Sequence, residues 1–307
     1  MSPNGSPDAN EYTIGWICAL PDELVVAGAM LDEHYYCPPQ PRSDHNKYTV
    51  GRIATHNIAI ACLPAGLYGT TSATRVAEQM QSTFQALRFT LMVGIGGGAP
   101  SNENDVRLGD VVVSQPTNGH GGVINYTFGK TLSGEGFQHT GFLGKPPQIL
   151  LNAMAHLKSK HRLHDPDLLG HLDQMGEEND HLYLAEYAHA GGQGDCDKCD
   201  PAKIKIRPVR QSQRPVIHYG LIASADIVMK DAIVRDKLQQ QHGILCFEME
   251  AAGLMNGLDC LVIRGICDYS DSHKNKRWQP YAAAASAAYA KELIYSLPLY
   301  SPPGSPR

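Results

Sequence analysis

Residues 244–268, ILCFEMEAAGLMNGLDCLVIRGICD, contain the alternation of elements that decides the fold. The apolar run at the start predicts a buried strand, residues 251–258 predict a short helix, and the apolar run at the end predicts a second buried strand. Strands joined by helices are typical of a largely parallel sheet. The stretch also carries Glu248 and Glu250, although carboxylates seldom lie buried without a partner.

The rest of the chain continues this alternation. Further strands are predicted at 12–20, 47–53, 56–66, 89–95, 108–116 and 214–224, and helices at 21–34, 69–84, 146–160, 226–241 and 279–297. We therefore predict an α/β fold in a single domain, with a central mixed, largely parallel sheet flanked by helices. The expected boundaries are a disordered N-terminus at 1–11, the domain at 12–298 with an irregular insertion at 160–212, and a loose tail at 299–307.

The composition is that of a globular protein. Hydrophobic residues make up 42% and charged residues 19% of the 307 residues, and the formal net charge is −5. There is no basic stripe and no apolar run of the roughly 18 residues that a membrane span needs, so we expect neither nucleic acid nor membrane as a partner. The N-terminus lacks the apolar core of a signal peptide, and most of the eight cysteines lie in apolar runs, which together predict a reducing, cytoplasmic location.

Acidic residues and glycines follow several of the predicted strands. Glu23 follows the first strand, a glycine-rich loop is predicted at 94–98, Glu250 follows one strand of the quoted stretch, and Asp268 follows the other. Because ligands of α/β sheets bind beyond the carboxyl ends of the strands, we expect these groups to converge on one edge.

Each of these features also has a purely structural explanation. Glu23 would favour the N-terminus of its helix, Glu248 or Glu250 would pair with Arg264, and Asp268 would cap a turn. The glycine run would form a tight turn, since its spacing does not match a nucleotide-phosphate loop. Several independent strand ends would then need unrelated explanations, so the sequence favours a shared site.

Seven motifs occur in the order found in the nucleoside phosphorylase and nucleosidase superfamily, which the chain resembles over residues 12–298. They are IGWICALPDE, AGLYGTTSA, MVGIGGGAP, LGDVVVS, GLIASADIVMKD, FEMEAAG and VIRGICDYSD. The resemblance is to the methylthioadenosine/S-adenosylhomocysteine nucleosidase side of the superfamily. The VGIGGG and FEMEAAG motifs and the stretch that begins CDYSDSHKNKRW resemble more specifically a fungal branch, often found at the N-terminus of NLR-type proteins.

The resemblance implies a role for each acid. Glu250 would accept hydrogen bonds from the ribose 2′ and 3′ hydroxyls, with Met249 packing on the sugar. Asp268 would act as the general acid that protonates purine N7 as the base departs. Glu23 would hold the water that attacks the anomeric carbon from the opposite face, as in an inverting glycosidase.

The resemblance also implies contacts around the base and the acid. Base contacts would come from Gly96, Gly97, Val228 and Met229. Cys267 stands where the nucleosidases usually carry Ser, and a thiol is the weaker hydrogen-bond donor. Arg264 would oppose the rise in pKa that burial imposes on Asp268, and Asp226 is expected to cap the helix that follows it.

The predicted reaction is hydrolysis. Phosphorylases place cations or hydroxyl groups near the positions of Glu23, Met92 and Ile95, where this chain has one acid and two apolar residues. Other residues that would build an anion site are His120, Arg107 and Lys130. We predict a purine nucleosidase, of adenosine type, that acts on a nucleoside and water without a cofactor as a homo-oligomer, a dimer or a trimer. The alternatives are a phosphate-dependent phosphorylase and a non-catalytic module that senses a nucleoside or nucleotide.

Two further groups are assigned more modest roles. The basic residues Lys274, Lys276 and Arg277 would meet a 5′-triphosphate or, more commonly, form a solvated face. Cys196-x2-Cys199, with His189 seven residues earlier, is compatible with a partial metal site, a redox pair or incidental loop cysteines. Because a zinc site needs four ligands and three are near in sequence, the sequence favours incidental cysteines and no metal.

Overall fold

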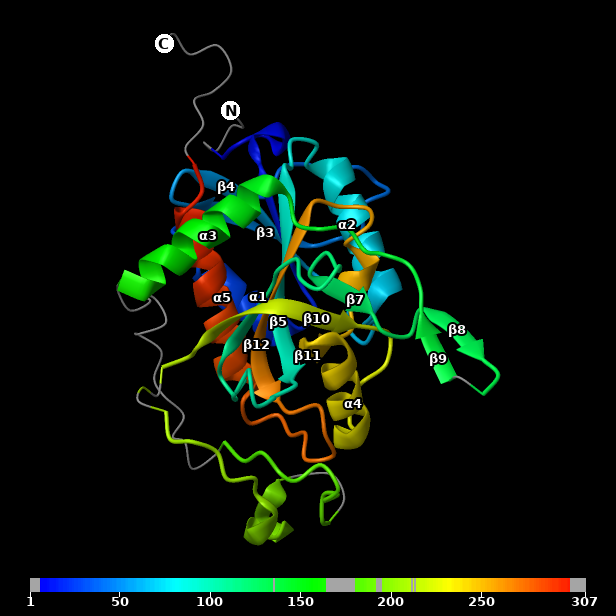
Figure 1. The fold of residues 1–307 in the computed structure, drawn as a ribbon. Coiled ribbons are helices and arrows are strands. Elements are labelled where there is room, and N and C mark those ends of the chain that lie inside the picture. The colour runs from blue at the N-terminus through cyan, green and yellow to red at the C-terminus, as the bar shows by residue number, and fades with distance from the viewer. Residues whose placement is uncertain are drawn as a thin grey trace.

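The computed structural model describes residues 6–134, 136–163, 180–191, 195–210, 212 and 214–298. Ten of the strands in these residues form one mixed sheet (Figure 1). Its order is β11 (Ile244–Glu248), β10 (Ile217–Ser224), β6 (Val111–Ser114), β12 (Cys260–Asp268), β5 (Phe89–Gly98), β1 (Ile14–Cys18), β4 (His56–Cys62), β3 (Tyr48–Ile53) and β2 (Glu33–Tyr35), while β7 (Val123–Asn125) pairs with β10. The parallel pairs at the centre, β4–β1–β5–β12, confirm the predicted α/β class and its mixed sheet.

The sheet also closes on itself. β5 runs parallel to β12, and its last residues, Gly97 and Gly98, pair antiparallel with Phe247 and Cys246 of β11. The strands β5, β12, β6, β10 and β11 therefore form a closed ring. The alternation of strands and helices does not predict this closure, which brings the carboxyl ends of β11 and β12 to opposite sides of Gly97.

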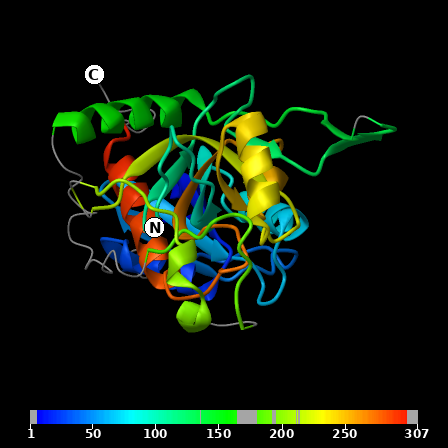
Figure 2. The same cartoon turned by 60° about the horizontal axis from the view of Figure 1, so that its bottom comes forward.

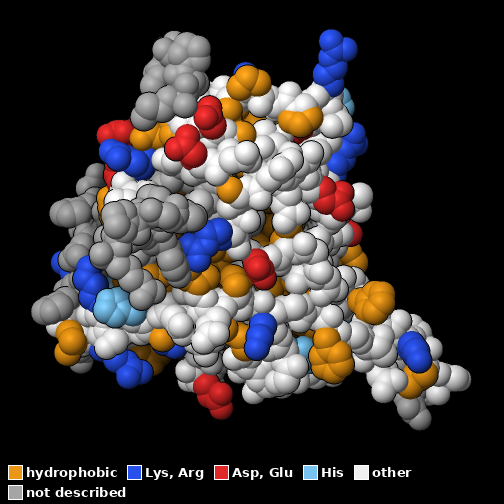
Figure 3. Space-filling model, turned by 90° about the horizontal axis from the view of Figure 1, so that it is seen from above, with side chains coloured by type: hydrophobic (Ala, Val, Ile, Leu, Met, Phe, Trp, Pro, Cys, Tyr) orange, Lys and Arg blue, Asp and Glu red, His pale blue; other side chains and the backbone are white. Residues whose placement is uncertain are grey.

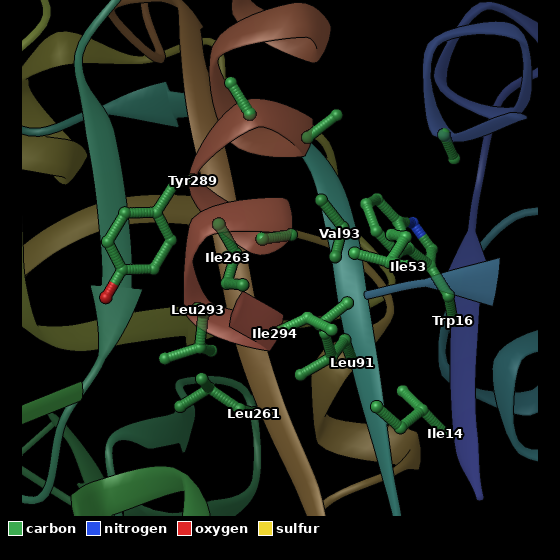
Figure 4. Close-up of a cluster of buried hydrophobic side chains, with 14 of the residues drawn as sticks. Ile14, Trp16, Ile53, Leu91, Val93, Leu261, Ile263, Tyr289, Leu293 and Ile294 are labelled. Carbon is green, nitrogen blue, oxygen red and sulfur yellow. The ribbon is translucent and has the colours of Figure 1, made fainter. Parts of the chain in front are cut away.

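Helices cover both faces of the central strands, because alternate residues of each strand point to opposite sides. The helices are α1 (Pro21–Ala29), α2 (Thr70–Thr83), α3 (Gln148–Leu163), α4 (Ala232–His242) and α5 (Gln279–Tyr295). Ile14 and Trp16 of β1 lie in the apolar cluster formed with α1, α3 and α5, whereas Ile17 lies in the cluster formed with α2. Figure 4 shows Leu293 and Ile294 of α5 against strand residues of the first cluster.

The predicted glycine loop is wrong, because β5 continues to Gly98. The residues 94–98 are held in the sheet by pairing with β12 on one side and, at their end, with β11 on the other. Glycines fit here because neighbouring groups approach the backbone closely; a Cβ atom on Gly96, for example, would lie 3.1 Å from the backbone oxygen of Phe247.

Three predicted helices are shorter than expected. The helix at 21–34 ends at Ala29, because residues 33–35 pair with β3 as strand β2. The helix at 226–241 begins only at Ala232, where the Asp231 carboxylate accepts from the N–H groups of the first turn. The helix at 251–258 is reduced to the 3-10 turn η6 (Ala251–Gly253), which contains a glycine.

The N-terminus is more ordered than predicted. Ala9–Glu11 form a 3-10 turn, and the Ser6 hydroxyl accepts a hydrogen bond from the Tyr36 N–H at 3.1 Å. The prediction of disorder is therefore wrong for residues 9–11. Residues 1–5 and the predicted loose tail 299–307 lie outside the described residues.

Two segments extend from this core. The hairpin of β8 (Gly129–Leu132) and β9 (Gly136–His139) projects from the body, as Figures 1 and 2 both show. The described part of the predicted insertion contains the turns η4 (Cys196–Lys198) and η5 (Pro201–Lys203) and lies beside the loop that follows β12 (Figure 2). Viewed from above, charged side chains of both signs are scattered over the surface (Figure 3). Among the described residues, no helix is long and apolar enough to cross a membrane.

Candidate active site

The glycine run of β5 forms the centre of the candidate site. β12 places Arg264 beside Gly94 and Asp268 beside Gly97. A Cβ atom on Gly94 would lie 2.4 Å from Glu23 Oε1, and one on Gly97 would lie 2.5 Å from Asp268 Oδ1. The absence of side chains on this strand therefore makes room for two carboxylates that come from distant parts of the chain.

Arg264 organises a buried charge cluster at one end of this run. Its side chain is 1% exposed, and its Nη2 donates to the carboxylates of Glu248 and Glu250, the latter at 3.3 Å. Burial alone would lower the pKa of Arg264, but Glu248, Glu250 and Glu23 together hold that pKa above its usual range. One cation thus faces three carboxylates, so these acids are not all fully neutralised.

Glu23 is fixed by backbone donors. Its Oε2 accepts from the N–H groups of Ala19 at 2.7 Å and Leu20 at 3.0 Å, and its Oε1 accepts from the Ile95 N–H at 2.8 Å. Burial raises the pKa of Glu23, while Arg264 opposes that rise. Glu23 therefore folds back over the start of α1, the structural alternative considered from the sequence, and also reaches β5.

Glu248 and Glu250 differ in how firmly they are bound. Glu248 pairs with Arg264 and accepts from the N–H groups of Glu250 at 3.1 Å and Ala251 at 3.0 Å. Glu250 lies farther from Arg264, at 3.3 Å. Burial raises the pKa of Glu250 to about 7; Arg264 opposes this rise, and the carboxylates of Glu248 and Glu23 add to it. Glu248 thus supports the strand end, whereas Glu250 retains capacity to accept hydrogen bonds from a ligand.

Asp268 occupies the other end of the run. Its Oδ1 accepts from the Ser270 N–H at 2.9 Å, and its Oδ2 lies 3.1 Å from Cys267 Sγ and 2.5 Å from Lys274 Nζ. The Cys267 thiol also lies 3.5 Å from the Gly96 carbonyl oxygen. Asp268 therefore caps the turn that follows β12, as one alternative proposed, and in addition forms an ion pair.

The ion pair of Lys274 with Asp268 is the feature of the site that the sequence did not predict. The Lys274 side chain is only 28% exposed, so the interpretation of this residue as part of a solvated face is wrong. Burial would lower the pKa of Lys274, but the nearby Asp268 carboxylate outweighs burial and raises that pKa. The only available signal was that a lysine follows Asp268 by six residues in an otherwise polar loop.

A cavity of about 360 Å³ opens beside Asp268. Asp268 and His273 line it from β12 and the following loop, and Tyr183 and Cys196 line it from the insertion. This volume is within the range for small-molecule pockets. Glu23 and Glu250 are not among its lining residues; they lie near Arg264, toward the other end of the glycine run from Asp268.

The remaining predicted contacts are distributed more widely. Met249 is partly buried between Glu248 and Glu250, Met229 packs against the apolar cluster under α4, and Val228 is 46% exposed. The prediction that Asp226 caps the following helix is wrong. Its carboxylate instead accepts from the N–H and the hydroxyl of Thr70, at 2.6 and 2.8 Å, and so caps α2, which brings this loop to another part of the chain.

The insertion also contains a group of potential metal ligands. His189, Cys196 and Cys199 place one ligand atom each within 4.8 Å of the others. Cys196 and Cys199 line the same cavity as Asp268.

The chain is similar in sequence to one protein family and to several known proteins. The family model of the phosphorylase superfamily matches residues 13–294. A nucleotide-binding leucine-rich repeat (NLR)-like protein of Hyaloscypha variabilis is 47% identical over 291 residues, which cover 92% of this chain and 29% of that protein. The chain thus spans less than a third of the length of this relative.

More distant similarities extend over whole proteins. The 5′-methylthioadenosine/S-adenosylhomocysteine nucleosidase of Mycobacterium bovis is 22% identical over 94% of this chain and 97% of that protein. The structure of futalosine hydrolase from Helicobacter pylori superposes with a TM-score of 0.63 at 15% identity, over 94% of this chain and 99% of that one. At this identity the structural match shows that the fold is shared.

Proposed function

This chain belongs to the phosphorylase superfamily, and from that membership we propose that it hydrolyses the N-glycosidic bond of a purine nucleoside, of adenosine type, to the free base and ribose. The observation that carries the proposal is the arrangement of acids along the glycine run of β5, with Glu23 and Glu250 around Arg264 and Asp268 at the other end. The resemblance noted from the sequence is confirmed at the level of the family.

Glu250 is proposed to bind the sugar. Its carboxylate is buried and only loosely paired with Arg264, so the ribose 2′ and 3′ hydroxyls would supply the donors that it lacks. Met249, next in the chain, would pack on the sugar ring. In this arrangement Glu248 holds Arg264, which leaves Glu250 available to the substrate.

Asp268 is proposed to deliver a proton to purine N7. As the glycosidic bond breaks, its electron pair passes to the base, and protonation of N7 neutralises the charge that develops. In the free protein the nearby proton is held by Lys274, whose ammonium group lies 2.5 Å from Asp268 Oδ2. When a base enters the cavity, the Lys274 ammonium group would pass its proton to the Asp268 carboxylate, and Asp268 would pass it on to N7.

Glu23 is proposed to act on the other face of the sugar. Water adds to the anomeric carbon as the base leaves, and its proton passes to the Glu23 carboxylate. Burial raises the pKa of Glu23, which makes it a stronger base than an exposed glutamate. Gly96 and Gly97 of β5 would lie against the base, with Cys267 supporting Asp268 from behind.

Hydrolysis is favoured over phosphorolysis by the surroundings of the residues considered for an anion site. Met92 is fully buried in the apolar core, and Arg264 is engaged by two carboxylates. Arg107, a candidate for an anion site, pairs with Asp105 at 2.6 Å. Lys130 lies on the exposed strand β8. Phosphate, which needs free cations or clustered donors, finds few of them among these residues.

The test is release of free base in phosphate-free buffer. The chain would be incubated with adenosine, inosine, guanosine, methylthioadenosine and ATP, with and without phosphate, and the products separated by chromatography. We expect free base without phosphate, and far slower release from the Asp268→Asn variant purified in the same way. Release only with phosphate would support a phosphorylase, and no release with retained binding would support a nucleoside-sensing module.

The same proposal includes the assembly state. We infer one domain over residues 12–298 that acts as a dimer or a trimer. Phe128 and Phe142, which are 61% and 82% exposed beside the β8–β9 hairpin, are the apolar residues expected to lie between copies. Sedimentation analysis of the full chain tests this, and a monomer at micromolar concentration would contradict it.

A further inference from the structure

We propose that His189, Cys196 and Cys199 bind a zinc ion that fastens the insertion to the loop after β12. One ligand atom from each residue lies within 4.8 Å of the other two. Ligand atoms on a tetrahedral zinc ion lie about 3.5–3.8 Å apart, given Zn–S and Zn–N distances of about 2.3 and 2.0 Å. The three side chains therefore need to close by no more than about an ångström to reach coordinating positions.

Local backbone structure brings the two cysteines together. They bracket the turn η4, in which the Cys199 N–H donates to the Cys196 carbonyl at 2.9 Å. A Cys-x2-Cys turn followed or preceded by a histidine is a common source of zinc ligands. Two thiolates and an imidazole favour zinc over hard cations such as magnesium, which prefer oxygen ligands.

The ring nitrogens of two histidines beside this turn favour a metal ion at this place. Both ring nitrogens of His189 are buried and have no hydrogen-bond partner among the described residues, and the same holds for His273. Buried imidazole nitrogens without partners are costly, and a metal ion satisfies one on each ring. The backbone N–H of His189 donates to Ser272 Oγ at 2.9 Å. This hydrogen bond holds the segment against the loop that carries His273.

His273 is the residue best placed to complete the site. Its ring centroid is 5.5 Å from that of His189, and its carbonyl oxygen is 3.9 Å from Cys196 Sγ. Its Nδ1 lies 3.6 Å from the Asp271 carboxylate, which is beyond hydrogen-bond distance but keeps a negative charge beside the ring. His273 thus lies next to the three ligands, although its ring nitrogens are not among the ligand atoms that all lie within 4.8 Å of one another, so it would join the ion as a fourth ligand only after a side-chain movement.

A metal ion would serve a clear structural purpose here. Few apolar residues of the insertion are buried; among those described they include Leu182, Tyr183 and Cys199. A segment with so small an apolar core gains much of its stability from a metal ion. Because Cys196 and His273 line the same cavity as Asp268, the ion would fix the outer wall of that cavity.

The experiment measures zinc in the full chain, purified with reductant, loaded with zinc sulfate, and passed through a desalting column. Metal analysis should give about one zinc ion per chain, and His189→Ala and Cys196→Ser should each lower the affinity, measured by competition with a chelator, by more than about tenfold. The matched controls are Cys37→Ser and His156→Ala, which replace exposed residues elsewhere and should bind zinc as the wild type does. His273→Ala should also weaken binding.

Two further measurements keep the result decisive if a variant fails to fold. Cobalt substituted in the wild type should give thiolate-to-metal absorption bands, and chelation should make residues 180–210 more sensitive to limited proteolysis, reversibly on addition of zinc. Wild-type protein that retains far less than one equivalent, or equal zinc affinity in wild type and His189→Ala, would overturn the proposal.

Discussion

The two ends of the β5 glycine run hold their carboxylates in different ways. Around Arg264, the partners are strand residues and backbone N–H groups, and the side chains of Glu248 and Glu250 are 1% and 7% exposed. Around Asp268, the partner is Lys274, which comes from a loop and is 28% exposed. The first end is thus the more deeply buried, whereas the second is completed by a partly exposed loop residue.

The largest effect is expected at the second end. Asp268→Asn should lower kcat by about 100- to 10,000-fold, the range for loss of a general acid, while KM changes much less. Rates of base release over a range of substrate concentrations measure this. Lys274→Met is the informative comparison, because it removes the proton source and keeps the acid, and we expect a smaller loss. Equal losses in kcat and in affinity for Asp268→Asn would contradict the acid role.

Substitution of Arg264 at the first end should lower the stability of the protein. Arg264→Met leaves the buried Glu248 and Glu250 without their cation, so the free energy of unfolding should fall by about 3–5 kcal/mol. Denaturant unfolding measures it. Arg52→Met is the matched control: it breaks an exposed pair with Glu33 and should cost less than about 1 kcal/mol. Similar losses in both variants would remove the distinction between the two ends.

Glu250 tests whether the first end also contacts substrate. Glu250→Gln keeps the shape but removes the charge that accepts from the ribose hydroxyls, and kcat/KM should fall by about 10- to 100-fold. A 2′-deoxynucleoside should be affected less by this substitution than the ribonucleoside, because it has already lost one donor. An identical loss for both sugars would count against sugar binding by Glu250.

The pH dependence should follow from the same residue. Burial raises the pKa of Glu250 to about 7, and its role requires the ionised form, so kcat/KM should rise as the pH increases through about 7. Assays from pH 5.5 to 8.5 in phosphate-free buffers measure this limb. A profile that is flat across this interval would show that ionisation of Glu250 is not needed in the free protein.

The smallest effect is expected from Cys267→Ser. The Cys267 thiol lies 3.1 Å from Asp268 Oδ2, and a hydroxyl is a better donor at nearly the same place. Since a typical hydrogen bond contributes about 1 kcal/mol, kcat should change by less than about fivefold. A loss as large as that of Asp268→Asn would mean that the thiol itself takes part in the reaction.

The sequence predicted the class of the fold well, because apolar runs such as 260–267 are long and uninterrupted. It also placed Glu23, Glu250 and Asp268 near strand ends. The closure of the sheet was not predictable, since the antiparallel contact of Phe247 with Gly97 is a tertiary pairing without a local pattern. For the same reason the glycine run was mistaken for a loop.

The contacts of individual side chains were the least predictable part. The ion pair of Lys274 with Asp268 and the contact of Asp226 with Thr70 depend on how loops return to the sheet, which composition does not encode. Likewise, His273 reaches the Cys196–Cys199 turn only because the insertion lies across the loop after β12. Periodicity identifies strands, but it says little about partners from different loops.

The closed ring of strands has a consequence for how the protein acquires activity during synthesis on the ribosome. Gly97 and Gly98 take their final neighbours from Phe247, Cys246 and Asp268, all of which are translated much later. Pairings between residues so distant in the chain form slowly and late. A nascent chain that stops before β12 lacks Arg264 and Asp268 and also α5, so on the proposed function truncated products should be inert rather than partially active.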